Sequence, residues 1–172
     1  MSHFSAHVLI SGSTKYVRER VSYLMAPYDN AFEVEEYETE CDCVGKEQAP
    51  DPDCEECGGT GRHLTTWNPM SKFDGYTVAD YEHVLQTAAR KPSEWDNDYE
   101  DRTGMAFLFN LDLDKLELPH VIVTPYGEWH EMKGDWYSEN RDSADWQEWK
   151  STVKEIYAKP PSTILVVLNC HQ

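Results

Sequence analysis

The segment that most constrains the fold is Cys41–Gly61, which reads CDCVGKEQAPDPDCEECGGTG. It contains two closely spaced cysteine pairs, which are Cys41 with Cys43 and Cys54 with Cys57. The surrounding sequence is acidic and shows no apolar periodicity long enough to build a core of its own. We therefore expect residues 39–62 to be an insert, held together by the cysteines, within a chain that folds as a single domain over residues 1–172.

Four thiolates at this spacing are a ligand set for tetrahedral Zn²⁺, and their softness disfavours Mg²⁺ and Ca²⁺. Because cysteine fills all four positions, we expect a structural ion whose binding energy contributes to folding, rather than a catalytic ion with an open position. The glycines that follow Cys57 let the backbone turn back, so that its amides can approach the sulfurs. The fifth cysteine, Cys170, lies just past the last apolar run, and we expect it to be a packed thiol.

An iron–sulfur centre, two disulfides or free thiols are the alternatives to zinc. The N-terminus shows no secretory signal, so we expect a cytoplasmic location, where thiols stay reduced and disulfides are rare. No apolar run is long enough to span a bilayer, so no membrane partner is expected.

The net charge of -17 comes from 32 Asp and Glu residues against 15 Lys and Arg residues. Two segments hold the excess, because residues 29–57 carry -11 and residues 92–118 carry -6. Both segments are interpreted as solvated surface or, alternatively, as surfaces for a basic partner. Nucleic acid is an unfavourable partner for a chain of this charge.

The remaining pattern predicts an α+β fold with a mixed or antiparallel sheet, about three helices and the four-cysteine zinc-binding insert. Strands are expected at Phe4–Ile10, His63–Trp67, Met105–Leu111, His120–Thr124 and Thr163–Leu168, and Glu128–Tyr137 is expected to form a further strand or an aromatic hairpin. Helices are expected from about Thr14 to Met25, from about Val78 to Arg90, and from a Ser143 cap to a stop at Pro160-Pro161.

A second candidate site surrounds the stretch 68–76. Lys72 and Asp74 share a face of an extended segment, and neighbouring polar and aromatic groups could complete a pocket for a small polar or aromatic ligand. The full set is Asn68, Lys72, Asp74, Tyr76, Trp129 and His130. The alternative is a tight Asn-Pro turn whose side chains tie down the insert. No hydrolase elbow, phosphate-binding loop or paired-histidine metal motif is present, so no catalytic residue is assigned.

The stretch Cys54–Gly61 fits the CxxCxGxG repeat of the J-domain co-chaperones (DnaJ). That resemblance covers about eight residues, and the chain has no His-Pro-Asp tripeptide. It implies shared zinc chemistry and no chaperone activity.

A wider pattern comprises Met1–Phe4, Ala26–Asn30, the CxC…CxxCxGTG insert, Thr66–Tyr76 and Thr163–His171. Together these stretches resemble a family of small tailed-phage proteins of unknown function. The Asn-Pro-x-Ser-Lys-aromatic-Asp motif at residues 68–74 is the most specific of them. The resemblance implies a phage origin and the host cytoplasm, and it brings no established activity.

The function expected from these features is that of a non-enzymatic phage accessory protein that binds a host protein with a basic surface. A host-defence component is the expected target, by analogy with other small acidic phage proteins. A protein that sequesters a small, nucleotide-like signal is the first alternative, and an enzyme with no recognisable motif is the second.

Overall fold

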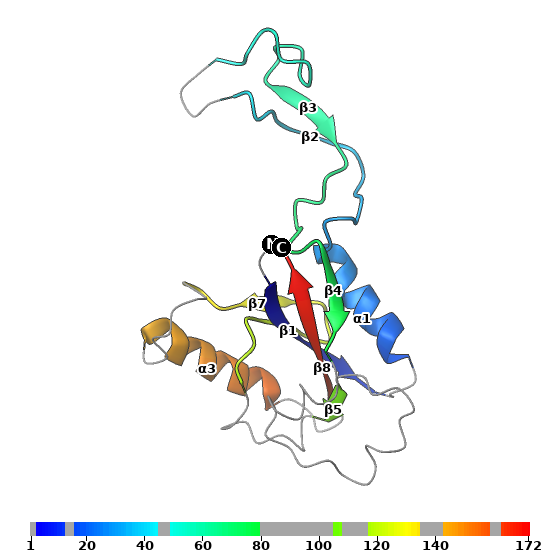
Figure 1. Cartoon of the computed structure of the whole chain (residues 1–172), viewed down its shortest axis with the longest axis vertical. Helices are drawn as coiled ribbons and strands as arrows, with labels where there is room; N and C mark the ends of the chain where they lie inside the picture. Colours follow the sequence, from blue (N-terminus) through cyan, green and yellow to red (C-terminus); the bar gives the residue numbers. More distant parts are fainter. Residues whose placement is uncertain are drawn as a thin grey trace.

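The computed structural model of the chain describes residues 3–12, 16–44, 49–79, 105–107, 117–134, 143–158 and 163–172. The fold is α+β, with a mixed sheet in the body and a separate two-stranded sheet in a projection from it (Figure 1). The expected fold class is confirmed at this level.

Two strands from opposite ends of the chain form the centre of the sheet. β1 (His3–Ser11) and β8 (Thr163–His171) pair antiparallel along their whole length, from His3 opposite His171 to Ser11 opposite Thr163. This register brings the two chain ends together, and Figure 1 marks them side by side at the foot of the projection.

The other strands extend this central pair. The order is β4-β8-β1-β6-β7, with β4 at Gly75–Val78, β6 at Val121–Val123 and β7 at Trp129–Glu131. β5 (Met105–Phe107) pairs with the first half of β8, whereas β4 pairs with its second half. Only the β1–β6 pair is parallel among these ladders, so the sheet is mixed.

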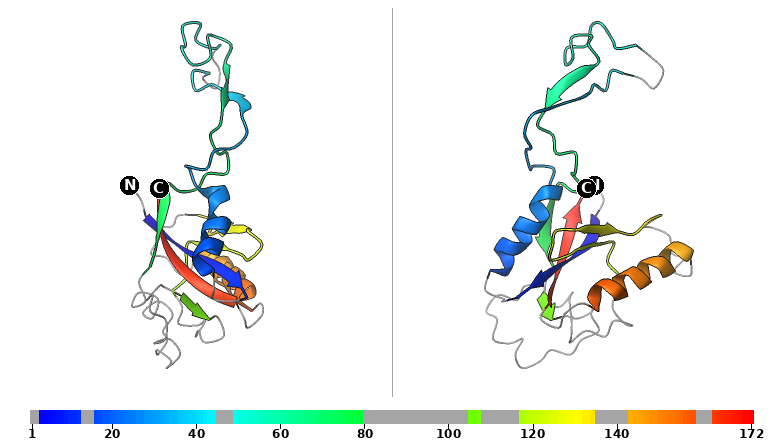
Figure 2. Two further views of the ribbon diagram at one scale, coloured as in Figure 1. Left: turned by 90° about the vertical axis from the view of Figure 1, so that its right-hand side faces the viewer. Right: turned by 180° about the vertical axis from the view of Figure 1, so that it is seen from behind.

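Both faces of β1 and β8 are buried, which explains their nearly continuous apolar sequences. One face packs against α1 (Val17–Met25) through Phe4, Ala6, Val8, Ile10, Ile164, Val166, Leu168 and Cys170. The other packs against α3 (Ala144–Tyr157) through Leu9, Leu165 and Val167. The two helices therefore lie on opposite sides of the central strands, as Figures 1 and 2 show.

Two expected helices are confirmed. α1 buries the apolar positions Val17, Val21, Leu24 and Met25, and the short 3-10 helix η1 (Ala26–Tyr28) follows at the expected stop. α3 begins at the expected cap, because the Ser143 side chain accepts a hydrogen bond from the backbone N–H of Trp146. The described residues thus contain two α-helices; the Thr14 cap lies outside them.

The helix predicted from Val78 to Arg90 is wrong at its start. Val78 is the last residue of β4 and lies opposite Leu168 of β8. The backbone N–H of Ala79 continues this ladder by donating to the carbonyl of Val167 at 2.9 Å. The backbone hydrogen bonds of Val78 and Ala79 are therefore made to β8 and not within a helix. Residues 80–90 of the predicted helix lie outside the described ranges.

The strand expectations are confirmed in part. Phe4–Ile10, His120–Thr124 and Thr163–Leu168 correspond to β1, β6 and β8, whereas the other three runs overlap the shorter strands β3, β5 and β7. β2 (Tyr37–Glu40) and β4 were not predicted. Residues 108–111 and 135–137 of the predicted strands lie outside the described ranges, as does most of the acidic segment 92–118.

The chain leaves the body after η1 and returns at β4. The stem consists of residues 29–36 and 66–74, which are joined where Asn30 donates to the carbonyl of Phe73 and Val34 donates to that of Thr66. The lobe, residues 37–65, consists of the β2–β3 (Arg62–Thr65) hairpin and the cysteine segment. Figures 1 and 2 show that stem and lobe project away from the body, and the expected insert 39–62 lies within the lobe.

In the part of the chain that the structure describes, neither α-helix combines the length and the apolar composition required to cross a bilayer.

We predict that Leu165→Ala lowers the free energy of unfolding by about 2–5 kcal/mol, because the Leu165 side chain is fully buried against α3. The matched control is Leu64→Ala, since Leu64 lies on β3 with 61% of its surface exposed and should change stability by less than about 0.5 kcal/mol. Urea unfolding monitored by tryptophan fluorescence measures both, and equal effects would contradict the proposed core.

Candidate metal centre

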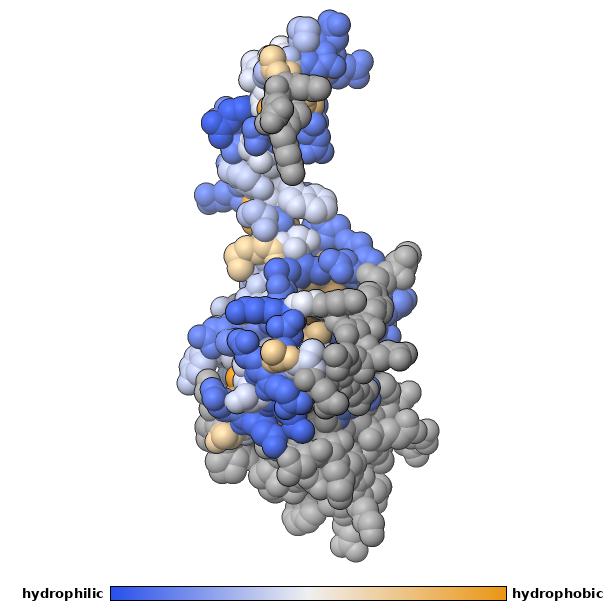
Figure 3. Space-filling model, turned by 90° about the vertical axis from the view of Figure 1, so that its left-hand side faces the viewer, coloured by the Kyte–Doolittle hydropathy of each residue, from blue (hydrophilic) through white to orange (hydrophobic). Residues whose placement is uncertain are grey.

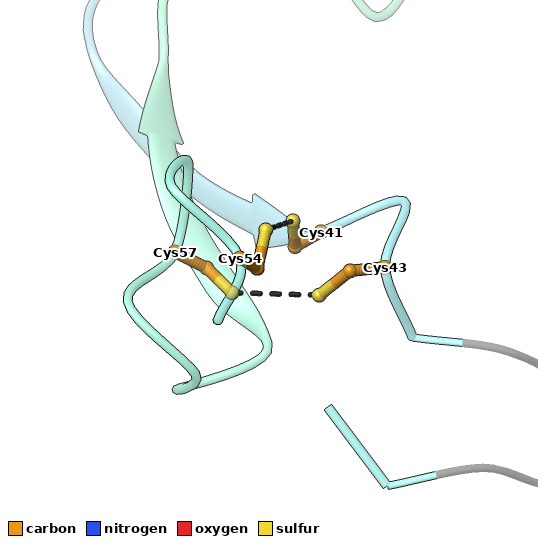
Figure 4. Close-up of side chains that lie close together, drawn as sticks. All are labelled: Cys41, Cys43, Cys54 and Cys57. Atoms are coloured by element: carbon orange, nitrogen blue, oxygen red, sulfur yellow. Dashed lines mark hydrogen bonds between the residues drawn. The ribbon is translucent and has the colours of Figure 1, made fainter. Parts of the chain in front are cut away.

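The β2–β3 hairpin positions the first cysteine. The hairpin ladder pairs Glu40 with Arg62, and it is extended by one hydrogen bond from the N–H of Cys41 to the carbonyl of Gly61 at 2.9 Å. Both ends of the cysteine segment are therefore fixed by sheet hydrogen bonds. The segment between them folds back so that all four sulfurs converge at the end of the hairpin (Figure 4).

The spacing of the sulfurs fits a tetrahedral metal ion. The Sγ atoms of Cys41 and Cys54 are 3.7 Å apart and those of Cys43 and Cys57 are 3.5 Å apart, and all four lie within 4.8 Å of one another (Figure 4). A zinc–sulfur bond of about 2.3 Å gives a sulfur–sulfur edge of about 3.8 Å in a tetrahedron. A disulfide needs about 2.05 Å, so the cysteines are free thiols here.

Backbone amides approach the sulfurs, as the glycines predicted. The N–H of Gly61 donates to the Sγ of Cys57 at 3.3 Å. Gly61 has a φ of +78°, and a Cβ there would lie 2.7 Å from the side chain of Pro50. A side chain at this position would strain the backbone and displace the loop that carries the second cysteine pair.

Cys57 is prepared to act as a thiolate. Burial by itself raises its pKa, but the backbone N–H of Gly61, the thiols of Cys43 and Cys54 and the backbone N–H of Gly59 lower the pKa to about 6. A cysteine with a depressed pKa is already ionised at neutral pH, which is the form that binds a metal ion.

Cys41, Cys43, Cys54 and Cys57 are thus the residues that would hold a metal ion, and such an ion would supply cross-links between the two ends of the segment. Cys170 is remote from them, because it is fully buried in the core against α1, and burial raises its pKa to about 12. The expectation that Cys170 is a packed thiol agrees with this position.

Two side chains beside the cysteines were missed by the sequence reasoning. Glu56 and His63 lie next to Cys41, and one ligand atom from each of the three falls within 4.8 Å of the others. Glu56 is an intervening residue of the CxxC pair, and His63 follows Gly61 by two residues. The pairing register of β2 with β3 brings His63 to the same side as Cys41, and this register cannot be read from the spacing of the cysteines.

Asn68, expected to bind a ligand or to tie down the insert, is buried at the base of the stem. Its side-chain amide donates to the carbonyls of Pro27 and Asp29 at 2.8 and 3.0 Å. Its side-chain oxygen accepts from the N–H of Met70 at 3.0 Å. The first two bonds join this segment of the stem to η1 and to the other segment, and the third closes a turn over residues 68–70, as the Asn-Pro turn interpretation requires.

Lys72 and Trp129 meet at a common partner, Glu131. The Lys72 Nζ lies 3.4 Å from a Glu131 carboxylate oxygen, to which the Trp129 indole N–H also donates at 2.8 Å. The Trp129 ring stacks on Phe73 with centroids 6.3 Å apart and tilts against Tyr28 at 4.7 Å. This cluster fastens the stem to β7.

The remaining candidates lie elsewhere. The Asp74 carboxylate accepts a hydrogen bond from Asn30 at 2.6 Å, and Tyr76 packs edge-on against Phe73. His130 lies on the opposite face of β7 from Trp129, and both residues line an open groove of about 390 Å³ beside α3. The six residues are therefore divided between the stem, its attachment to the body and the α3 side.

A larger cavity of about 500 Å³ opens on the α3 side of β1, β4 and β8, and it is lined in part by Ser5, His120 and Asn169. The Ser5 Oγ lies 3.0 Å from His120 Nδ1, which also accepts the Ser5 N–H at 3.1 Å. Burial lowers the His120 pKa, whereas the charge of Glu117 raises it. The backbone N–H of His120 donates to the backbone carbonyl of Ser5, so this pair of residues extends the β1–β6 ladder.

The comparisons give no relatives from which a role could be transferred. No protein-family model matches the chain, and no curated protein or solved structure is significantly similar to it. The functional argument therefore depends on the geometry described above.

We predict that chelation exposes four cysteines to alkylation and leaves the fifth protected. The reagent reacts with thiolates, and the sulfurs are accessible once the metal is removed; Cys57, whose pKa is lowered to about 6, should react first, whereas the raised pKa of Cys41 and of Cys43 slows their reaction. Cys170 combines complete burial with a pKa of about 12, so it should react only after unfolding in guanidinium. Mass spectrometry counts the added groups with and without chelator. Equal labelling of the cluster in both conditions would contradict metal binding.

We predict that Asn68→Ala lowers the free energy of unfolding by about 1–3 kcal/mol, because it removes the buried amide that donates to the carbonyls of Pro27 and Asp29 in a partly buried position. Lys72→Ala is the comparison, since it removes a partly exposed ion pair worth less than about 1 kcal/mol. Thermal unfolding compares the two variants. A smaller effect for Asn68→Ala than for Lys72→Ala would contradict the structural role of Asn68.

Proposed function

We propose that this protein is a non-enzymatic binding protein whose acidic lobe is folded by a structural Zn²⁺ and binds a basic surface of another protein. The observation that carries the proposal is the projection of the lobe from the body, with four convergent cysteines inside it and carboxylates around it (Figure 1).

The zinc part of the proposal follows from the lack of an apolar core among the described residues of the lobe, 37–44 and 49–65. β2 and β3 are four residues each, and every second residue is exposed while the residues between are only half-buried. A lone two-stranded hairpin is marginally stable in water. A metal ion held by Cys41, Cys43, Cys54 and Cys57 would supply the missing stabilisation, since metal-binding free energy acts as folding free energy in such small units.

The charge of the lobe selects the class of partner. Eleven carboxylates are exposed along stem and lobe, namely Glu33, Glu35, Glu36, Glu38, Glu40, Asp42, Asp51, Asp53, Glu55, Glu56 and Asp74. Arg62 pairs with Glu38 at 3.4 Å and offsets one of them. Four thiolates around Zn²⁺ would add a further charge of about -2. Figure 3 shows a mostly hydrophilic surface on the face of the projection that it presents. Such a surface attracts a basic protein and repels nucleic acid.

The projection also offers apolar contacts. Phe32, Trp67 and Met70 on the stem and Leu64 on the lobe are among the exposed large hydrophobic residues. Aromatic residues and methionine are enriched in protein interfaces, where they supply the buried contact area that charges do not. Carboxylates that guide association, together with a few apolar anchors, are the composition expected of a protein-binding projection.

The biological setting that we propose is a phage-encoded accessory protein acting in the host cytoplasm, with a host-defence component as its target. The resemblance of the Asn-Pro-x-Ser-Lys-aromatic-Asp motif and the CxC…CxxCxGTG insert to small tailed-phage proteins supports this setting. Non-enzymatic action is proposed because the chain lacks the catalytic motifs named above.

We predict that the stem variant Glu33→Gln/Glu35→Gln/Glu36→Gln weakens capture of a specific host protein about tenfold, because it removes three exposed negative charges from the binding projection. The control Glu19→Gln/Glu148→Gln/Glu155→Gln removes the same charge from exposed positions of α1 and α3 and should capture as the parent does. Quantitative mass spectrometry of proteins retained from host lysate provides the measurement, at two salt concentrations.

The same experiment is repeated after chelation, which should abolish capture if metal folds the lobe. A partner retained equally by parent, stem variant, control and chelated protein would overturn the role of the lobe. If no protein is retained and native mass spectrometry instead detects a bound metabolite, the alternative of a small-molecule binder gains support. The cavity beside Ser5 and His120 is the observation that favours this alternative.

A further inference from the structure

We propose that a second divalent cation binds beside the four-cysteine site, held by the thiolate of Cys41, the carboxylate of Glu56 and the imidazole of His63. The Cys41 sulfur would then bridge two ions. This inference rests on the structural ion proposed above, because that ion is what keeps Cys41 ionised and the segment folded.

The hairpin register brings Cys41 and His63 together. Thr39 lies opposite His63 in the β2–β3 ladder, and the hydrogen bond from Cys41 to Gly61 extends the same register by two residues. Cys41 and His63 are thus diagonal neighbours on one face of the hairpin, within reach of each other's side chains. Glu56 approaches this face from the turn between Cys54 and Cys57.

The distances match the edges of a metal coordination sphere. One Glu56 carboxylate oxygen lies 3.6 Å from the Cys41 Sγ, and the other lies 3.5 Å from the His63 Nε2. Zinc bonds of about 2.0 Å to oxygen and nitrogen and about 2.3 Å to sulfur give edges of about 3.3–3.5 Å. While Cys41 is a thiol, the first contact is a hydrogen bond from its S–H to Glu56; once the thiol is ionised, the same separation fits two ligands of a shared ion.

The charges call for a cation at this place. With the first ion bound, Cys41 is a thiolate, and a carboxylate of Glu56 beside it can only accept hydrogen bonds. Two neighbouring anionic acceptors repel each other unless a cation lies between them. Within the described residues, the second ring nitrogen of His63, Nδ1, is buried without a hydrogen-bond partner. The imidazole is therefore not committed elsewhere.

The ligand types identify the class of ion and its exchange behaviour. A thiolate, an imidazole and a carboxylate are suited to Zn²⁺ and not to Mg²⁺ or Ca²⁺. Three protein ligands leave a fourth position for water, and the Glu56 side chain is 58% exposed. The second ion should consequently be bound more weakly than the first and should exchange with free zinc, so that the charge of the lobe varies with zinc availability.

The test is native mass spectrometry of the full-length protein at increasing Zn²⁺ concentration, in a buffer free of thiol reducing agents, which bind zinc. The parent should acquire two ions in separate steps, and the weaker ion should leave first on addition of a mild chelator. Glu56→Gln and His63→Gln should each retain the first ion and lose the second. Glu55→Gln, which removes the same charge from the adjacent exposed position, should bind two.

Each outcome has one interpretation. A parent that binds no ion refutes the structural zinc site and this inference together. A parent that binds one ion, which Glu56→Gln and His63→Gln weaken about 10- to 100-fold, overturns the second site and shows that the two residues only support the first. One ion with unchanged affinity in both variants also overturns it, and shows that neither residue contributes to metal binding.

Discussion

The antiparallel pairing of β1 with β8 is the constraint on which the rest of the structure depends. Because both strands are apolar on both faces, each must be covered twice, and α1 and α3 supply the two covers. β8 also carries β4 and β5 along its other edge. The position of β4 fixes where the stem re-enters the body, so the site of the lobe is set by a pairing between the two chain ends.

Much of this arrangement could be predicted from local patterns, and the failures share one physical cause. The strands β1 and β8, the Ser143 cap and the buried face of α1 follow from apolar periodicity and capping chemistry. Val78 was assigned to a helix because its neighbours have helical spacing, but pairing with Leu168 determines its conformation. β2 was not predicted because its acidic sequence, YETE, has no strand-like pattern and pairs with a strand distant in sequence. β2 starts at Tyr37, and its partner β3 starts 25 residues later at Arg62.

The candidate site shows the same division. Cysteine spacing alone identified the four convergent residues, because chemistry restricts what closely spaced thiols can do. Asn68, Lys72 and Asp74 were predicted as candidate ligand-binding residues, with a tight turn as the alternative, and only their hydrogen bonds show how they hold the stem. Glu56 and His63 required the hairpin register, which depends on non-local pairing.

The pairing of the first strand with the last has a consequence for how the chain folds during synthesis. Contacts between residues near the two ends have the largest possible sequence separation, which makes their formation slow. The body cannot complete its sheet until β8 has left the ribosome, whereas the lobe contains all its own strand pairs and cysteines within residues 37–65. Metal binding by the lobe, as proposed above, could therefore precede completion of the body, because it needs no strand or cysteine from outside residues 37–65.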